Sequence, residues 1–155
     1  MTFLQGDRTR FDVIVLDFPD PTQFSLGKLF STRFYTSVRD HLADGGTLGV
    51  QATSPLLSRH SYWSIIATLR SVGFTVVPYR VFVPSFGDWG FAVARLESFA
   101  FPSVPSQVPL ATLDSGSFAA LTDMPVDTRR IPAMPNHLDN QSLVSTYLQE
   151  IARFD

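Results

Sequence analysis

A single stretch near the amino terminus sets the strongest limit on what this chain can fold into. Residues 11–16 read Phe-Asp-Val-Ile-Val-Leu, a β-branched run with almost no polar alternation. Such a run is typical of a strand buried on both faces, as in a parallel sheet. It is followed by Asp17-Phe18-Pro19-Asp20-Pro21, where two prolines are incompatible with a strand ladder and with a helix. The stretch therefore predicts an α/β fold whose strand ends abruptly at a turn that carries two carboxylates.

Helical and strand patterns alternate after this turn. Ser31 can cap a helix, and apolar side chains then recur at helical spacing, at Phe34, Tyr35, Val38 and Leu42. Asp44-Gly45-Gly46 is expected to end that helix. Residues Thr47–Gln51 are then expected to form a second buried strand.

A second helix and a pair of strands complete the pattern. The helix is expected over Arg59–Val72, with Gly73 at the position of a left-handed C-cap. Strands are expected at Phe74–Val83, interrupted by Pro78, and at Trp89–Leu96. The connection between them is short enough to make them antiparallel neighbours. The order β-α-β-α-β-β is that of half of a doubly wound α/β domain with an antiparallel end.

The composition of the sequence changes after residue 98. Six of the 11 prolines lie between Pro102 and Pro135, which favours an extended wrap over the surface. A closing helix is expected from Asp139, with apolar residues on one side at Leu143, Tyr147, Leu148 and Ile151. We therefore divide the chain into an α/β part, 1–98, and a proline-rich wrap with a closing helix, 99–155.

Composition excludes several classes of function. The formal net charge is −2, so no basic surface of the kind that binds nucleic acid is expected. The chain has no cysteine, which removes disulfides, thiolate metal sites and a cysteine nucleophile. His41, His60 and His137 lack metal-ligand spacing, and we expect them at the surface or at helix ends. No apolar run approaches the ~20 residues of a membrane span, so a cytoplasmic protein is expected.

Candidate chemistry lies at the ends of the first two strands. In open α/β sheets, ligands bind at the carboxyl ends of parallel strands. Asp17 and Asp20 occupy this place after the first strand, and Gln51–Pro55 occupies it after the second. Two carboxylates three residues apart can hold an ammonium group, and the proximity of like charges keeps one of them ready to accept a proton. The alternative is that both aspartates only cap turns.

The loop before the last strand is a second candidate. It carries Phe86 and Trp89, whose aromatic faces can bind cations and methylene chains. The alternative is that both rings belong to the core of a hairpin.

In this order, the segments resemble the spermidine synthases, which are polyamine aminopropyltransferases on a methyltransferase-like fold. The similar stretches are Asp-Val-Ile-Val-Leu-Asp-Phe-Pro-Asp-Pro at 12–21, Leu29-Phe30-Ser31 with Phe34-Tyr35, Gly45-Gly46 with Val50-Gln51, Tyr62-Trp63-Ser64-Ile65, and Pro-Ser-Phe-Gly-Asp-Trp-Gly-Phe at 84–91. The resemblance is strongest to a bacterial branch whose intact proteins carry a membrane-spanning region ahead of this domain. The tail of that branch also carries a stretch like Leu-Asp-Asn-Gln at 138–141.

The resemblance implies a role for each candidate residue. Asp17 would accept the proton of the putrescine amine, and Asp20 would help to anchor the diamine. Gln51 would lie close to the site, while Phe86 and Trp89 would wall the amine channel. Decarboxylated S-adenosylmethionine would be a co-substrate, with no permanently bound cofactor and no metal.

The resemblance also implies a fold and its partners. We expect the carboxy-terminal half of an S-adenosylmethionine-methyltransferase-like (Rossmann-like) sheet, with strand order 4-5-7-6 in the family's numbering. The family's glycine-rich nucleoside loop precedes the position of Phe11. Strand 11–16 is therefore expected to pair with a missing amino-terminal half or to self-associate through its edge, and the proline-rich tail could instead cover that edge. Intact relatives would hold the domain on the cytoplasmic side.

Two other functions remain open at this point. The chain could serve a different S-adenosylmethionine-dependent transfer on the same fold, or it could be a non-catalytic interaction module. Calorimetry with decarboxylated S-adenosylmethionine or methylthioadenosine would separate an enzyme from an interaction module.

Overall fold

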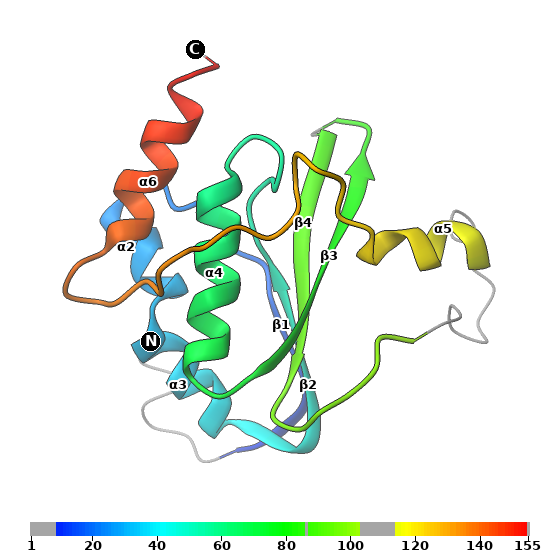
Figure 1. Cartoon of the computed structure of the whole chain (residues 1–155). Coiled ribbons are helices and arrows are strands. Elements are labelled where there is room, and N and C mark those ends of the chain that lie inside the picture. Colours follow the sequence, from blue (N-terminus) through cyan, green and yellow to red (C-terminus); the bar gives the residue numbers. More distant parts are fainter. Residues whose placement is uncertain (1–8, 86, 103–113, 155) are drawn as a thin grey trace.

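A four-stranded sheet with helices packed mainly on one face forms the body of the molecule (Figure 1). The structure, a computed structural model, describes residues 9–85, 87–102 and 114–154. The strands are β1 (Phe11–Leu16), β2 (Leu42–Gln51), β3 (Thr75–Val83) and β4 (Gly87–Arg95). The helices are α2 (Phe24–Gly27), α3 (Thr32–Asp40), α4 (Arg59–Ser71), α5 (Ser115–Ala119) and α6 (Ser142–Ile151), with 3-10 turns η1 (Lys28–Phe30) and η2 (Ala120–Thr122).

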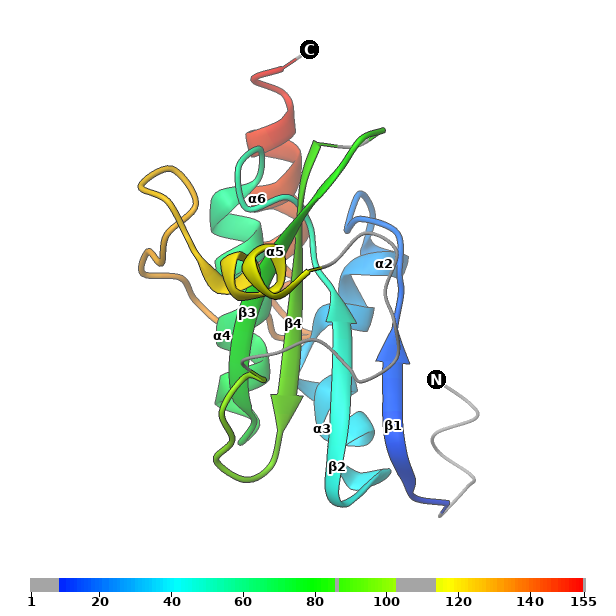
Figure 2. The ribbon, with the colours of Figure 1, turned by 90° about the vertical axis from the view of Figure 1, so that its right-hand side faces the viewer.

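The sheet has the order β1-β2-β4-β3. Strands β1 and β2 are parallel, whereas β4 runs antiparallel to both β2 and β3. This arrangement confirms the predicted strand order and the predicted parallel pairing of the first two strands. Figure 2 shows the sheet face-on, with β1 at one edge and β3 at the other.

Helices α3 and α4 supply most of the core. The hydroxyl of Ser31 accepts a hydrogen bond from the N–H of Phe34 (3.3 Å), which confirms the predicted cap of α3. Along α4, the side chains of Tyr62, Ile65, Ile66 and Leu69 are fully buried. That helix ends as predicted, with Gly73 at φ +97°, a conformation that favours glycine. The 3.6-residue spacing in the sequence therefore identified both core helices.

The boundary between α3 and β2 differs from the prediction. The helix ends at Asp40, and Leu42 already belongs to β2, where it pairs with Phe11. The register then shifts, so that Val13 pairs with Thr47, and Gly45 takes φ +72° inside the irregular segment. Pairing with β1 therefore draws the segment around Asp44-Gly45-Gly46 into the strand instead of leaving it as a turn.

Strand β1 was expected to be buried on both faces, and this expectation is wrong. Leu16 faces the core, but Val13 and Val15 are 64% and 72% exposed. The helices α3 and α4 lie on the other side of the sheet (Figure 1), and no described element covers these two valines. An apolar strand sequence cannot distinguish a face covered within the chain from one left open.

Strand β3 is continuous through Pro78, which was expected to interrupt it. Pro78 lies in register with Ala92 of β4. Because β3 is an edge strand, its proline disturbs no ladder on the outer side.

The tail is anchored to the helices by buried polar side chains. The amide nitrogen of Asn136 donates to the carbonyl oxygens of Gly27 (3.0 Å) and Phe30 (3.3 Å), and its oxygen accepts from the N–H of Leu143. Glu150 of α6 accepts from the N–H groups of His60 (2.7 Å) and Ser61 (3.0 Å). A carboxylate from α6 thus caps the amino terminus of α4, which has no cap from its own Ser58.

Helix α6 confirms the predicted closing helix, although it begins at Ser142 instead of Asp139 and its apolar face is narrower than expected. Leu143 and Tyr147 are buried, but Leu148 is 43% exposed because only one stripe of the helix packs against the molecule. Of the described parts of the tail, η2 packs against β3, and α6 packs against α4 and α2. None of them pairs with the outer edge of β1 (Figure 2). Among the described helices the longest has 13 residues, and none has the length and hydrophobicity to cross a membrane.

Candidate active site

The candidate residues lie together along the edge of the sheet that is formed by the strand ends, where β1 and β2 end and β4 begins. Leu16 pairs with Val50, and Val50 pairs with Ala92, so the three strands are aligned at this edge. Just beyond it, the N–H of Ala52 donates to the carbonyl oxygen of Gly90 (2.9 Å). The turn after β1 and the start of β4 are therefore brought to the same edge as the end of β2.

The turn that carries the two aspartates is held from both sides. The ring of Phe18 packs edge-on against Phe30 and Phe34, with ring centroids 6.1 and 5.7 Å away. The side-chain nitrogen of Gln51 donates to the carbonyl oxygen of Phe18 (3.2 Å). Because Phe18 is held in the core, the aspartates on either side of it stay at the surface of the site.

The two carboxylates lie in different environments. Asp17 is exposed, whereas Asp20 is half-buried. The hydroxyl of Tyr147, from α6, donates to Oδ2 of Asp20 at 2.6 Å. Burial raises the pKa of Asp20, and hydrogen bonds with the hydroxyls of Tyr147 and Thr53 partly offset this rise. The pair therefore combines an accessible carboxylate with one that is fixed by the surrounding protein.

Tyr147 is itself held in its neutral form. Burial, followed by the hydrogen bond and the charge of Asp20, raises the pKa of Tyr147. A neutral phenol is a hydrogen-bond donor, which matches the short contact with a carboxylate. The hydroxyl therefore fixes one oxygen of Asp20, Oδ2, in place.

The aromatic loop is only partly described. Trp89 is half-buried on β4 and pairs in register with Val81. Phe86 lies outside the described residues. Next to Trp89, Asp88 forms a salt bridge with Arg80 (3.0 Å), which joins the two strands of the hairpin. Trp89 thus lies at the same end of the sheet as the two aspartates, near the start of β4.

Position 90 has no room for a side chain. A Cβ at this position would overlap the ring of Tyr62 and lie 2.6 Å from the carbonyl oxygen of Thr53. The hydroxyl of Tyr62 donates to the carbonyl oxygen of Phe91 (3.0 Å). Glycine at position 90 therefore allows β4, α4 and the loop after β2 to approach closely behind the site.

The sequence analysis missed Tyr147 as a site residue and gave Thr53, within Gln51–Pro55, no role of its own. Tyr147 was assigned only to the apolar face of the closing helix. Its proximity to Asp20 depends on how the tail folds back, and a contact between residues 20 and 147 leaves no periodic signal.

The histidines occupy helix-end and surface positions. His41 is the C-cap of α3, and His60 and His137 bond to Glu150 and Thr32. Within the described residues, no three acidic or histidine side chains gather in a way that could hold a metal ion.

Comparison with known proteins now places the chain. The profile of the spermine/spermidine synthase domain matches residues 1–101. The chain belongs to the spermine/spermidine synthase family. It is 42% identical over 149 residues to polyamine aminopropyltransferase 2 of Ralstonia nicotianae, covering 96% of this chain and 29% of that protein. It is 46% identical over 136 residues to a polyamine aminopropyltransferase of Mycobacterium tuberculosis, covering 86% of this chain and 26% of that protein.

Solved structures of the family agree with the fold. The spermidine synthase of Thermotoga maritima superposes with a TM-score of 0.63 at 21% identity, covering 80% of this chain and 44% of that one. A spermidine synthase in complex with the transition-state analogue AdoDATO gives a TM-score of 0.64 at 23% identity, with 80% and 45% covered. The sheet is thus that of the family's methyltransferase-like fold, and the chain spans under a third of the curated relatives' length.

Proposed function

We propose that the protein containing this chain transfers an aminopropyl group from decarboxylated S-adenosylmethionine to a diamine such as putrescine. The single observation that carries the proposal is the pair Asp17 and Asp20, which a chain of this family presents at the carboxyl end of β1 in two unlike environments. An exposed carboxylate suits proton transfer and a fixed one suits binding.

The proposed reaction needs a free amine at the reacting end of the diamine. Asp17 accepts a proton from the ammonium group, and the nitrogen lone pair then attacks the methylene carbon bonded to the sulfonium. A carbon–nitrogen bond forms as the carbon–sulfur bond breaks, and its electron pair neutralises sulfur, which leaves as methylthioadenosine. A sulfonium is a good leaving group, so this chemistry asks the protein mainly for orientation and proton acceptance.

Asp20 anchors the ammonium group of the diamine in this proposal. Its Oδ2 is held by Tyr147 at 2.6 Å, and a carboxylate has further lone pairs that can accept from the ammonium group of the substrate. Gln51 supports the turn through its bond to Phe18, and Trp89 and Phe86 would line the path of the methylene chain. Residues 1–98 thus carry the candidate reacting groups, while the wrap 99–155 contributes Tyr147.

Strand β1 also carries a proposal about partners. Its outer edge has no partner strand in the described chain, and Val13 and Val15 are exposed beside it. Apolar edges of this kind seek a further strand. We propose that this edge pairs with a further part of the family's domain or, in its absence, with a second copy of the chain. Cytoplasmic placement, the absence of a resident cofactor and the absence of nucleic-acid binding stay predictions.

The proposed function is tested by product formation. The purified protein is incubated with decarboxylated S-adenosylmethionine and putrescine, and methylthioadenosine and the aminopropylated amine are quantified. The proposal expects both products in equal amounts. Methyl transfer from S-adenosylmethionine instead would favour another transfer reaction, and binding of neither nucleoside by calorimetry would favour an interaction module.

A further inference from the structure

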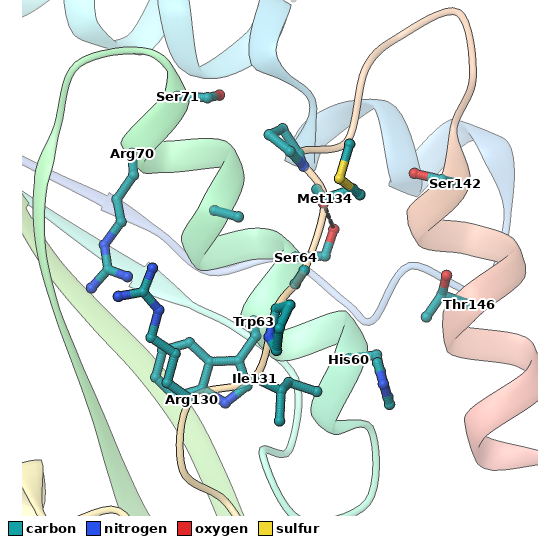
Figure 3. Close-up of a pocket in the computed structure, with 14 residues that line it drawn as sticks. His60, Trp63, Ser64, Arg70, Ser71, Arg130, Ile131, Met134, Ser142 and Thr146 are labelled. Carbon is teal, nitrogen blue, oxygen red and sulfur yellow. Dashed lines mark hydrogen bonds between the residues drawn. The ribbon is translucent and has the colours of Figure 1, made fainter.

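A cavity of about 780 Å³ lies on the far side of α4 from the sheet. Its walls are α4, the extended segment 130–135 and the first turns of α6 (Figure 3). None of the aspartates of the candidate active site borders it. The volume falls within the roughly 300–1,000 Å³ typical of small-molecule sites.

The walls of this cavity are fixed by hydrogen bonds between α4 and the extended segment. The ring nitrogen of Trp63 donates to the carbonyl oxygen of Thr128 (3.0 Å), and the hydroxyl of Ser64 donates to that of Met134 (2.7 Å). Further along, the N–H of Asn136 donates to the hydroxyl of Thr68 (2.8 Å). Arg59 of α4 also donates to the carbonyl oxygen of Arg129 (2.7 Å). The chain is therefore held to the helix before, within and after this segment, and the cavity exists before any ligand binds.

Two arginines face each other at one end of the cavity. Arg70 projects from α4 and Arg130 from the extended segment, and Figure 3 shows their guanidinium groups side by side. One nitrogen of Arg70 donates to the carbonyl oxygen of Val76 (3.2 Å), which fixes the orientation of its guanidinium. Burial and the charge of Arg130 both lower the pKa of Arg70, because burial removes water from the charged guanidinium and Arg130 repels it.

The positive charge at this end is not neutralised within the described chain. No carboxylate of the described residues lies within salt-bridge distance of Arg70 or Arg130. His60, which lines the other end of the cavity, bonds to Glu150, and this carboxylate also accepts from Ser61. The cavity is therefore polarised, with two guanidinium groups at one end that no described carboxylate neutralises.

We propose that this cavity binds an oxyanion, a phosphate or a carboxylate, carried on an apolar group. Two adjacent guanidinium groups can each donate two hydrogen bonds to such an anion, and this neutralises their mutual repulsion. Apolar side chains then continue from the charged end, at Trp63, Ala67, Ile131 and Met134. This site is separate from the proposed aminopropyl transfer and does not depend on it.

Isothermal titration calorimetry of the full chain with phenyl phosphate, benzoate and inorganic phosphate tests the proposal. We expect phenyl phosphate or benzoate to bind more tightly than inorganic phosphate, because only the first two fill the apolar part. The stronger of the two identifies the preferred anion. Affinity should fall as salt is raised, because salt screens the charges.

Variants locate the bound anion. Arg70→Gln and Arg130→Gln should each weaken binding about tenfold or more, and together they should abolish it. Arg33→Gln, at an exposed position of α3, removes the same charge elsewhere and should leave binding unchanged. Arg130 is exposed, so its variant keeps the test valid even if Arg70→Gln unfolds, which circular dichroism would reveal.

The proposal is overturned by any of three results. The first is that neither aromatic anion binds at millimolar concentration. The second is that the double variant binds the anion as tightly as the wild type does, and the third is that neutral benzyl alcohol binds as tightly as the aromatic anions.

Discussion

Removing the hydroxyl of Tyr147 should weaken diamine binding while leaving the chemical step nearly intact. Tyr147→Phe keeps the buried ring and deletes the hydroxyl, which donates to Asp20 at 2.6 Å and also contacts Thr53. A hydrogen bond to a charged group contributes about 1.5–3 kcal/mol, which corresponds to a factor of about 10 to 150. Thr53 still contacts Asp20, so we expect the lower end, with KM for putrescine raised about tenfold and kcat changed less than about twofold.

The pH dependence supplies a readout that a purely structural role would not change. The bond from Tyr147 lowers the pKa of Asp20, so its loss raises that pKa. Because the anchoring form of Asp20 is ionised, the acid limb of kcat/KM should move to higher pH in the variant. Steady-state kinetics across pH, with putrescine varied, measures both effects.

A second tyrosine provides the matched control. Tyr35 is fully buried, and its hydroxyl has no hydrogen-bond partner in the described structure. An unpaired buried hydroxyl costs about 1–3 kcal/mol, so Tyr35→Phe should raise the free energy of unfolding by about 1 kcal/mol and leave KM unchanged. An unchanged KM and an unmoved acid limb in Tyr147→Phe would refute the positioning role, provided the wild-type protein is active.

Three further predictions concern stability and assembly. Gly90→Ala should lower the free energy of unfolding by about 1–3 kcal/mol in urea titrations, because its Cβ overlaps Tyr62; a wild-type midpoint would contradict this packing. Burial raises the pKa of Asp20, so folding loses stability as pH rises from the unfolded value near 3.8 to the folded one. The free energy of unfolding of Asp20→Asn should therefore rise relative to that of the wild type across this pH window and equal it below the window. A difference in unfolding free energy that is the same at every pH would contradict this prediction. Light scattering of the isolated chain at micromolar concentration should show a dimer that Val13→Pro disrupts with circular dichroism unchanged, whereas a monodisperse monomer would exclude self-association.

Much of the sheet could be predicted from local sequence pattern. The run at 11–16 and the spacing of Tyr62, Ile65 and Leu69 identified elements whose type depends on their own residues. The misplaced boundary at Leu42 and the uninterrupted strand at Pro78 depend instead on which strand lies alongside. The same holds for Val13 and Val15, since an apolar side chain does not reveal what will cover it.

Only the part of the candidate site that follows from the order of the strands could be predicted from the sequence. Asp17, Asp20 and Gln51 follow strands that proved to be parallel neighbours, so their grouping at one edge followed from topology. The difference between the two aspartates could not be predicted, because it depends on Tyr147 reaching back across 127 positions of the chain. Gln51 also does more than line the site, since it binds the carbonyl of Phe18.

The central claim is that Asp17 accepts the proton that frees the attacking amine. It is tested most directly by the turnover of Asp17→Asn, measured as methylthioadenosine released at saturating putrescine. Asp12→Asn, which removes another exposed carboxylate from β1, is the matched control. We predict that kcat of Asp17→Asn falls by about 100-fold or more while Asp12→Asn keeps wild-type turnover, because an amide cannot accept the proton. Near-normal turnover of a folded Asp17→Asn protein would contradict the account.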